Sequence, residues 1–307
     1  MSKTQTISNA ILALFLAATV AATVAHSQEA AAPAAVRDTA WKTGGQIGVN
    51  FSQVALSNWS GGGQNTLAIA GLVTMFANMK TDATAWDNGL DVGYGFTKLA
   101  EQDFRKSDDK VILISKYGYK ATDQLFYSAL LDARTQLSDG FNYDKIDSAT
   151  GNPTIISRFA APAYVTLGLG LTWKPADYFQ VFLAPISNRL ILVMDDTLSS
   201  AGAFGVDPGK KVNSELGALL NATFKKELMT NVTLSSRLNL FSAYESFDKA
   251  VVTWESLLGL KVNDYITASV ALDVLYDEKV KITRDDKTVG PSTQIREVLA
   301  IGLGYKF

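Results

Sequence analysis

Apolar side chains alternate with small or polar ones along most of the chain from Trp41 to Phe307. In residues 164–173, the apolar set is Val165, Leu167, Leu169, Leu171 and Trp173, and the set between them is Tyr164, Thr166, Gly168, Gly170 and Thr172. Residues 86–96 and 266–276 repeat the pattern. A period of two residues is typical of β-strands whose two faces meet different surroundings.

The same pattern, read between turn residues, predicts about twelve strands. They are expected at 44–56, 65–79, 84–99, 110–121, 125–137, 163–173, 178–193, 214–226, 231–243, 250–262, 265–277 and 292–307. Pro185 interrupts the seventh strand, so a bend or bulge is expected there.

The connections between these strands alternate in length. Short ones are expected at 80–83, 122–124, 174–177, 227–230 and 263–264, and longer ones at 57–64, 100–109, 138–162, 195–213, 244–249 and 277–291. Short turns on one rim and long loops on the other are characteristic of outer-membrane barrels, whose periplasmic turns are tight. The sequence therefore predicts an all-β fold: a single transmembrane antiparallel β-barrel of the outer-membrane type, with both termini on the short-turn side.

The chain begins with features of a secretory signal. Lys3 precedes an apolar stretch at 11–24, and Ala25-His26-Ser27 offers a small-x-small cleavage pattern. We expect a signal peptide at 1–27, a flexible segment at 28–40 and the barrel at 41–307. The alternative, a retained anchor, is disfavoured because the apolar stretch is shorter than the roughly 20 residues of a spanning helix.

Cleavage at this site removes the single histidine of a chain that has no cysteine. Histidine-dependent barrel phospholipases and proteases are therefore excluded, and we expect no enzyme activity. No cofactor or metal site is expected, because the acidic residues of the last long loop lack a calcium-loop spacing. A net charge of -2 with interspersed signs gives no basis for binding nucleic acid.

A secreted soluble β-sandwich is the alternative fold. The predicted strands are long for a sandwich, whose strands usually have about five or six residues. The chain also ends in alternating apolar residues, with Tyr305 and Phe307 last in that series. This ending resembles the signal that barrel-assembly machinery recognises, whereas in a soluble protein it would leave an apolar edge strand unprotected.

If the apolar face meets lipid, the opposite face lines the lumen. The charged candidates on it are Asp87, Asp91, Lys116, Asp132, Arg134, Glu215, Arg237, Glu255, Lys261, Asp273 and Arg296. Buried charges must be paired or hydrated, so mixed signs on neighbouring strands predict salt-bridge ladders and a partly plugged lumen. Structural pairing without any transport role is the alternative interpretation.

Several motifs are more specific than a barrel requires. They are 58–65 (Asn-Trp-Ser-Gly-Gly-Gly-Gln-Asn), 116–121 (Lys-Tyr-Gly-Tyr-Lys-Ala), 159–164 (Phe-Ala-Ala-Pro-Ala-Tyr), 202–208 (Gly-Ala-Phe-Gly-Val-Asp-Pro) and 303–307 (Leu-Gly-Tyr-Lys-Phe). In this order they resemble the DUF3078 family of Bacteroidetes. The resemblance implies an outer-membrane protein of unassigned function. Within the first motif, Asn58, Trp59, Gly61, Gly62, Gly63 and Gln64 are candidates for a constricting or ligand-contacting loop, or for a simple turn.

Two functions remain open from the sequence. One is a narrow porin-like channel that transports an unknown small solute across the outer membrane through a charged, partly plugged lumen. The other is a non-conducting structural or interaction barrel, whose long outer loops bind a surface partner or an envelope assembly. In either case the expected surroundings are outer-membrane lipids, and the expected folding partner is the barrel-assembly machinery.

Overall fold

A computed structural model describes residues 41–56, 64–148, 150–263, 265–280, 282–283 and 288–307. The predicted signal peptide and flexible segment lie outside the described residues, and so do Asn58, Trp59, Gly61, Gly62 and Gly63 of the candidate loop. Gln64 is described; it is exposed and precedes the second strand.

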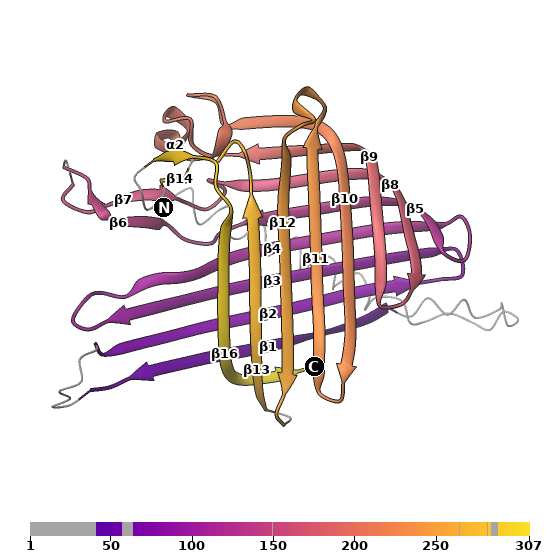
Figure 1. Cartoon of the computed structure of the whole chain (residues 1–307), viewed down its shortest axis with the longest axis horizontal. Coiled ribbons are helices and arrows are strands. Elements are labelled where there is room, and N and C mark those ends of the chain that lie inside the picture. The colour runs from indigo at the N-terminus through magenta and orange to yellow at the C-terminus, as the bar shows by residue number, and fades with distance from the viewer. Residues whose placement is uncertain (1–40, 57–63, 149, 264, 281, 284–287) are drawn as a thin grey trace, which may run out of the picture. The chain divides into compact units, whose positions relative to one another are not determined.

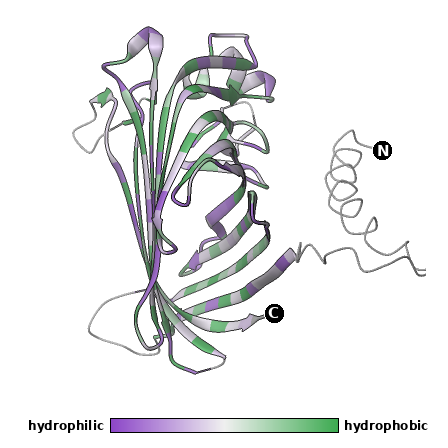
Figure 2. Ribbon diagram, turned by 90° about the vertical axis from the view of Figure 1, so that its right-hand side faces the viewer, coloured by the Kyte–Doolittle hydropathy of each residue, from purple (hydrophilic) through white to green (hydrophobic). Residues whose placement is uncertain are grey.

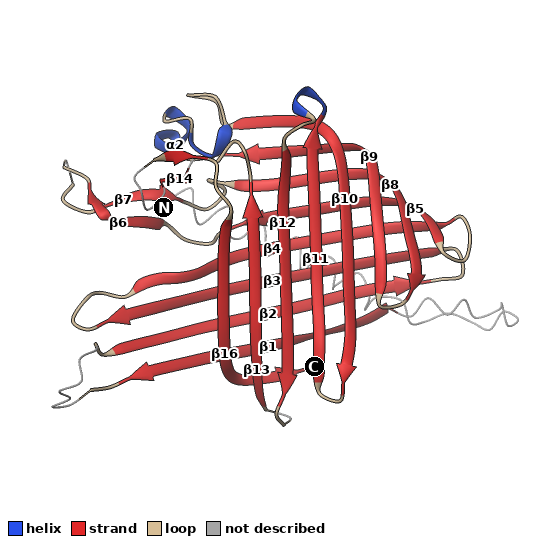
Figure 3. Ribbon diagram, viewed as in Figure 1, coloured by secondary structure: helices blue, strands red, loops and turns tan. Residues whose placement is uncertain are grey.

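Twelve antiparallel strands form a closed barrel (Figures 1 and 3). They are β1 (Trp41–Val54), β2 (Thr66–Lys80), β3 (Thr84–Leu99), β4 (Arg105–Lys120), β5 (Leu125–Thr135), β8 (Ala163–Ala176), β9 (Phe179–Leu192), β10 (Val212–Met229), β11 (Val232–Ala243), β12 (Ala250–Lys261), β13 (Ile266–Tyr276) and β16 (Gln294–Lys306). Each pairs with its sequence neighbours in the barrel, and β16 returns to β1. The predicted fold class and strand number are confirmed.

The two rims differ as the sequence predicts. The turn rim carries the short connections and the C-terminus, and the loop rim carries the long ones (Figure 1). Three loop-rim connections contain further structure: the hairpin β6 (Gly140–Ile146) and β7 (Pro153–Ser157), the helices α2 (Asp196–Ser200) and η1 (Ala203–Gly205), and the strand pair β14 (Ile282–Thr283) and β15 (Val289–Gly290). A further short helix, η2 (Tyr244–Ser246), joins β11 to β12. β4 begins at Arg105, so the predicted loop at 100–109 is about half strand.

The outward face of the barrel is apolar and open to the surroundings. Hydrophobic positions recur along every part of the wall in Figure 2. Leu169 on β8, Leu183 on β9 and Leu299 on β16 have 57%, 53% and 73% of their surface exposed. In water such a continuous exposed surface would promote aggregation, whereas it suits contact with lipid.

Pro185 lies inside β9, which is a central strand. One residue of each neighbouring strand faces two of β9 there: on β8, Leu169 and Leu171 pair with Ile186 and Leu183, and on β10, Gly217 and Leu219 pair with Ser187 and Ala184. This bulge accommodates a residue that has no N–H to donate. It also reverses which side chains of β9 face inward, from Phe182 and Ala184 to Ser187 and Arg189, all four of them buried.

The C-terminal residue helps to close the barrel. The backbone N–H of Phe307 donates to the Gly45 carbonyl at 3.1 Å, and the Gly45 N–H donates to the Phe307 carbonyl at 2.9 Å. A Cβ on Gly45 would lie 2.6 Å from Cζ of Phe307, so glycine makes room for the terminal ring.

If the outward face meets lipid, replacing Leu169 by Arg should destabilise the folded barrel by about 2–4 kcal/mol, because a charge at mid-bilayer loses hydration. The measurement is urea titration of the protein refolded in liposomes, followed by heat-modifiable gel migration. Val289→Arg, at a loop-rim side chain with 63% exposure, is the matched control and should have little effect. Equal destabilisation by both substitutions would contradict a lipid-facing wall.

Candidate functional site in the barrel interior

A charged side chain crosses the interior near the turn rim. Lys116 on β4 faces Asp87 on β3 in the strand register. Its Nζ donates to Oε1 of Gln180 on β9 at 2.5 Å. β4 and β9 are separated in the sheet by β5 and β8. The hydrogen bond therefore reaches across the barrel and not along its wall.

An apolar cluster fills the part of the interior bounded by β5, β9, β10 and β11. Its buried members are Leu130, Phe182, Ala184, Leu219, Phe241 and Ala243, with Ile114 and Val251 packed against them. Phe182 has no exposed surface. Such packing is typical of a protein core and not of a water-filled channel.

A row of four charges, two carboxylates flanked by two arginines, lies on the other side of the interior. Arg237, Glu255, Asp273 and Arg296 occupy directly paired positions on four consecutive strands, β11, β12, β13 and β16. Arg296 contacts Asp273 at 2.7 Å, and Arg237 lies 3.8 Å from Glu255. The two outer pairs are opposite in charge and compensate one another where hydration is limited, whereas Glu255 and Asp273 at the centre are both acidic.

Two ion pairs join this row to the far wall. Arg134 on β5 donates to Asp132 on the same strand at 2.8 and 3.0 Å, and its Nη1 reaches Oε1 of Glu255 at 3.0 Å. Arg296 also reaches Asp108 on β4 at 2.8 Å. None of these strand pairs are neighbours in the barrel. We call Arg134–Glu255 and Arg296–Asp108 the cross-lumen pairs.

A second ionic cluster lies toward the loop rim. Arg189 contacts Glu215 at 3.2 Å and Asp277 at 2.6 Å, and Lys279 also binds Glu215. The side chains of Arg189, Glu215 and Asp277 are 10% exposed or less. The guanidinium of Arg189 lies 5.2 Å from the centre of the Tyr164 ring. The connection after β13 thus folds inward and covers this end of the lumen.

The sequence analysis missed several of these residues. Strict alternation from Phe182 would place Arg189 on the outer face, and only the bulge at Pro185 turns it inward. Asp277 and Lys279 follow the last residue of β13, where period-two alternation no longer applies. Asp108 lies in a segment expected to be loop. The interruption at Pro185 is the one sequence signal that could have pointed to Arg189.

The remaining candidates have simpler surroundings. Asp91 is partly buried and faces Thr74 and Ile112 in the register, and in the described part of the chain no ion pair to it lies within 4.0 Å. Lys261 is exposed at the turn rim, opposite Thr267. Tyr305, 62% exposed, faces Ile47 across the closing seam.

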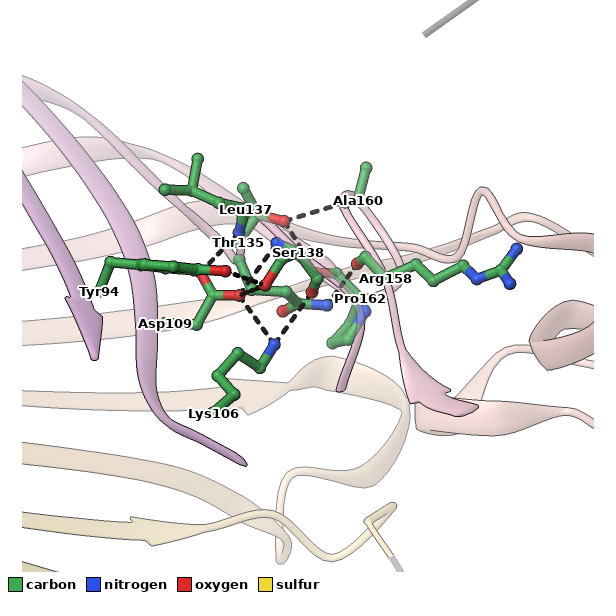
Figure 4. A network of polar contacts seen from close by, with 10 residues as sticks. Tyr94, Lys106, Asp109, Thr135, Leu137, Ser138, Arg158, Ala160 and Pro162 are labelled. Carbon is green, nitrogen blue, oxygen red and sulfur yellow. Dashed lines mark hydrogen bonds and ion pairs between the residues drawn. The ribbon is translucent and has the colours of Figure 1, made fainter. Parts of the chain in front are cut away.

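A network around Asp109 anchors the long β5–β8 connection to the outside of the wall (Figure 4). The Asp109 carboxylate accepts hydrogen bonds from the backbone N–H of Leu137 at 2.7 Å, from both the N–H and the hydroxyl of Ser138 at 2.9 Å, and from Lys106 at 2.8 Å. The Tyr94 hydroxyl donates to that of Ser138 at 2.9 Å. Farther along the connection, Arg158 pairs with Asp195 at 2.9 Å. The loop rim is therefore held in a defined arrangement.

In the ranges described, no three His, Cys, Asp or Glu side chains are grouped so that they could hold a metal ion. No helix among these residues is both long and apolar enough to cross a membrane.

Residues 51–141 match the family described as "Protein of unknown function (DUF3078)". No curated protein matches the chain.

Several solved structures are similar to the chain at low identity and low TM-score. The translocator domain of the autotransporter NalP from Neisseria meningitidis is 12% identical, with 99% of this chain and 98% of that chain covered and a TM-score of 0.38. The COG4313 outer membrane channel from Pseudomonas putida F1 is 12% identical, with coverages of 92% and 100% and a TM-score of 0.40. OmpT, an outer membrane protein of Vibrio cholerae, is 8% identical, with coverages of 87% and 97% and a TM-score of 0.31. These similarities concern the barrel fold alone.

Removing the Asp109 carboxylate should release the β5–β8 connection. Asp109→Ala leaves the N–H groups of Leu137 and Ser138 without their acceptor, which costs about 1–3 kcal/mol locally. We expect trypsin to cleave at Lys145 or Arg158 about tenfold faster or more. Asp123→Ala, at an exposed turn-rim ion pair, is the control and should leave the rate unchanged. Equal rates in all three proteins would show that the network does not hold the loop.

Proposed function

We propose that the protein is an outer-membrane β-barrel that passes small solutes through a gated lumen, with the cross-lumen pairs as the gate. The observation that carries this proposal is the joining of non-neighbouring strands by Arg134–Glu255 and Arg296–Asp108. A barrel wall needs no such bonds for its own hydrogen-bond ladder. Ion pairs across the interior are costly to form, and they are also the contacts whose release would open a path.

The proposed location is supported by the outward face. Its apolar side chains are exposed, and polar groups on it have partners: Nε1 of Trp86 donates to Ser115 at 2.9 Å, and Nε1 of Trp254 donates to Ser236 at 2.9 Å. In lipid an unpartnered polar group would cost several kcal/mol. Cleavage of residues 1–27, assembly by the barrel-assembly machinery, a source among the Bacteroidetes and the absence of enzyme activity belong to the same proposal.

Each cross-lumen arginine keeps one carboxylate partner when the carboxylate across the lumen is replaced. Arg134 keeps Asp132 when Glu255 is replaced, and Arg296 keeps Asp273 when Asp108 is replaced. The carboxylate side is therefore the cleaner place to test the gate, because Arg134 and Arg296 stay compensated. Arg237 loses only its longer contact with Glu255, at 3.8 Å.

We expect the variant carrying Glu255→Gln and Asp108→Asn to conduct in planar bilayers more often, or with larger steps, than the unmodified protein. The physical reason is that two contacts spanning the lumen are lost while the hydrogen-bonded wall is intact. Glu245→Gln, in the short helix η2 on the loop rim, is the matched control and should behave like the unmodified barrel.

A folded double variant that is as silent as the unmodified barrel would contradict the channel. It would favour the second candidate, a non-conducting interaction barrel. The observation in favour of that candidate is the ordered loop rim, in which Asp109 and Asp195 hold the β5–β8 connection.

A further inference from the structure

The seam between β1 and β16 is closed over only part of its length. Its register pairs Gln46–Asn50 with Gly302–Lys306, which is five pairs. On their other sides, β1 makes fourteen pairs with β2, and β16 makes ten with β13. Continuing the seam would pair Phe51 with Ile301 and Val54 with Val298, but these pairs are not formed. In Figure 1, β16 (yellow) and β1 (indigo) meet near the C-terminus and then diverge.

Among the residues that the structure describes, the divergence leaves two strand edges without a strand partner. Residues 51–54 of β1 pair there only with β2, and residues 294–301 of β16 only with β13. In lipid, unpaired backbone groups are so unfavourable that barrels normally close completely. A seam that is left unpaired in the loop-rim half of the wall is therefore unusual for a barrel in lipid.

Several side chains at the gap are apolar, although Gln53 and Glu297 are polar members of its outward face. Outward, Phe51, Leu299 and Ile301 are 57%, 73% and 64% exposed. Val298 belongs to the inward set, yet it is 39% exposed. By contrast, the inward Phe182 on the far wall has no exposed surface. The inward side chain beside the gap is thus accessible, whereas the cluster around Phe182 is filled.

The space behind the gap is lined by small and apolar residues of β2 and β16, with Asn50 and Ser52 as the inward residues of β1. The inward positions of β2 are Ala68, Ala70 and Leu72, and those of β16 are Val298, Ala300 and Gly302. Arg296 follows Val298 toward the loop rim on the same inward face, and its ion pair with Asp108 on β4 spans the interior behind β1, β2 and β3. This ion pair limits the apolar space on the loop side.

We propose that the loop-rim half of the β1–β16 seam is a lateral portal through which the acyl chain of an amphiphile in the bilayer enters the lumen. The proposal rests on the membrane location proposed above, and it names amphiphiles with an acyl chain as the substrate class. An acyl chain matches the apolar lining on both sides of the gap. A β-strand of another protein fits less well, because the two edges diverge and one strand could pair with only one of them.

The test uses lipids whose acyl chains carry bromine, which quenches a fluorophore on contact. The chain has no cysteine, so a bimane label can be placed at a single position: Val298→Cys at the gap, Leu299→Cys on the outward face, or Ser235→Cys on the inward face of β11. Each full-length protein is refolded into vesicles of brominated or unbrominated phosphatidylcholine, and heat-modifiable migration confirms the closed barrel. Ala300→Cys, two residues from Val298 on the same face, is a second reporter in case Val298→Cys does not fold.

The portal predicts quenching at Val298 comparable to that at Leu299 and absent at Ser235. Quenching at Leu299 alone would overturn the portal. It would mean that β1 and β16 are fully paired in the membrane, or that another strand covers their edges. Absence of quenching at Leu299 would overturn the membrane location together with the portal. Conductance in planar bilayers separates the two proposals. A barrel that conducts but shows no quenching at Val298 would support the channel without the portal. A barrel that is quenched at Val298 but does not conduct would support the portal without the channel.

Discussion

The constraint on which the structure depends is that every backbone N–H and C=O in an apolar environment must have a partner. Twelve strands joined edge to edge satisfy this around almost the whole wall. Most other features follow from it. The alternation of side chains gives the wall one apolar and one mixed face, and the terminal Phe307 adds bonds to Gly45 where the two ends of the sheet meet. The places that depart from the constraint are few, and they are informative.

One such place is the interior, where charge and apolar packing share a confined space. The buried cluster around Phe182 occupies one side, while the row from Arg237 to Arg296 occupies the other. Two arginines of this region each have two carboxylate partners, one on the same or the adjacent strand and one across the lumen. This arrangement lets each cross-lumen bond be lost while its arginine keeps a carboxylate partner. A lumen can therefore be both partly filled and gated. The apolar cluster on one side stays packed, while the ion pairs on the other side can separate.

Much of the fold could be predicted from the sequence, because period-two alternation is a local property. The strand from Thr84 to Leu99 was predicted with the same limits, and others differ by a few residues at their ends. The exceptions have identifiable causes. β4 begins earlier than predicted because charged residues such as Lys106 and Asp109 continue the ladder beyond the apolar run. Arg189 could not be assigned inward without knowing that the bulge at Pro185 reverses the alternation.

The candidate site was less accessible to sequence reasoning. Alternation predicts which charged residues face inward, but it does not predict which of them form ion pairs. Arg134 and Glu255 are 121 residues apart, and their contact depends on how the barrel closes and how its strands are staggered. The short β1–β16 seam has little local signal either, because Phe51 and Ser52 continue the alternation of the paired part of β1 and only Gln53 and Val54 break it. Pairing between the first and last strands is a non-local property of the whole sheet.

The central claim, that the cross-lumen pairs close the lumen, is tested most directly by access to a single cysteine at Ser269. This residue lies on the inward face of β13, on the turn-rim side of Asp273. A charged, membrane-impermeant thiol reagent would be added to vesicles from the loop-rim side only. The account predicts slow labelling of Ser269→Cys in the otherwise unmodified barrel and rapid labelling once Glu255→Gln and Asp108→Asn are added. Equally rapid labelling in both proteins would contradict it, because the lumen would then be open with the ion pairs in place.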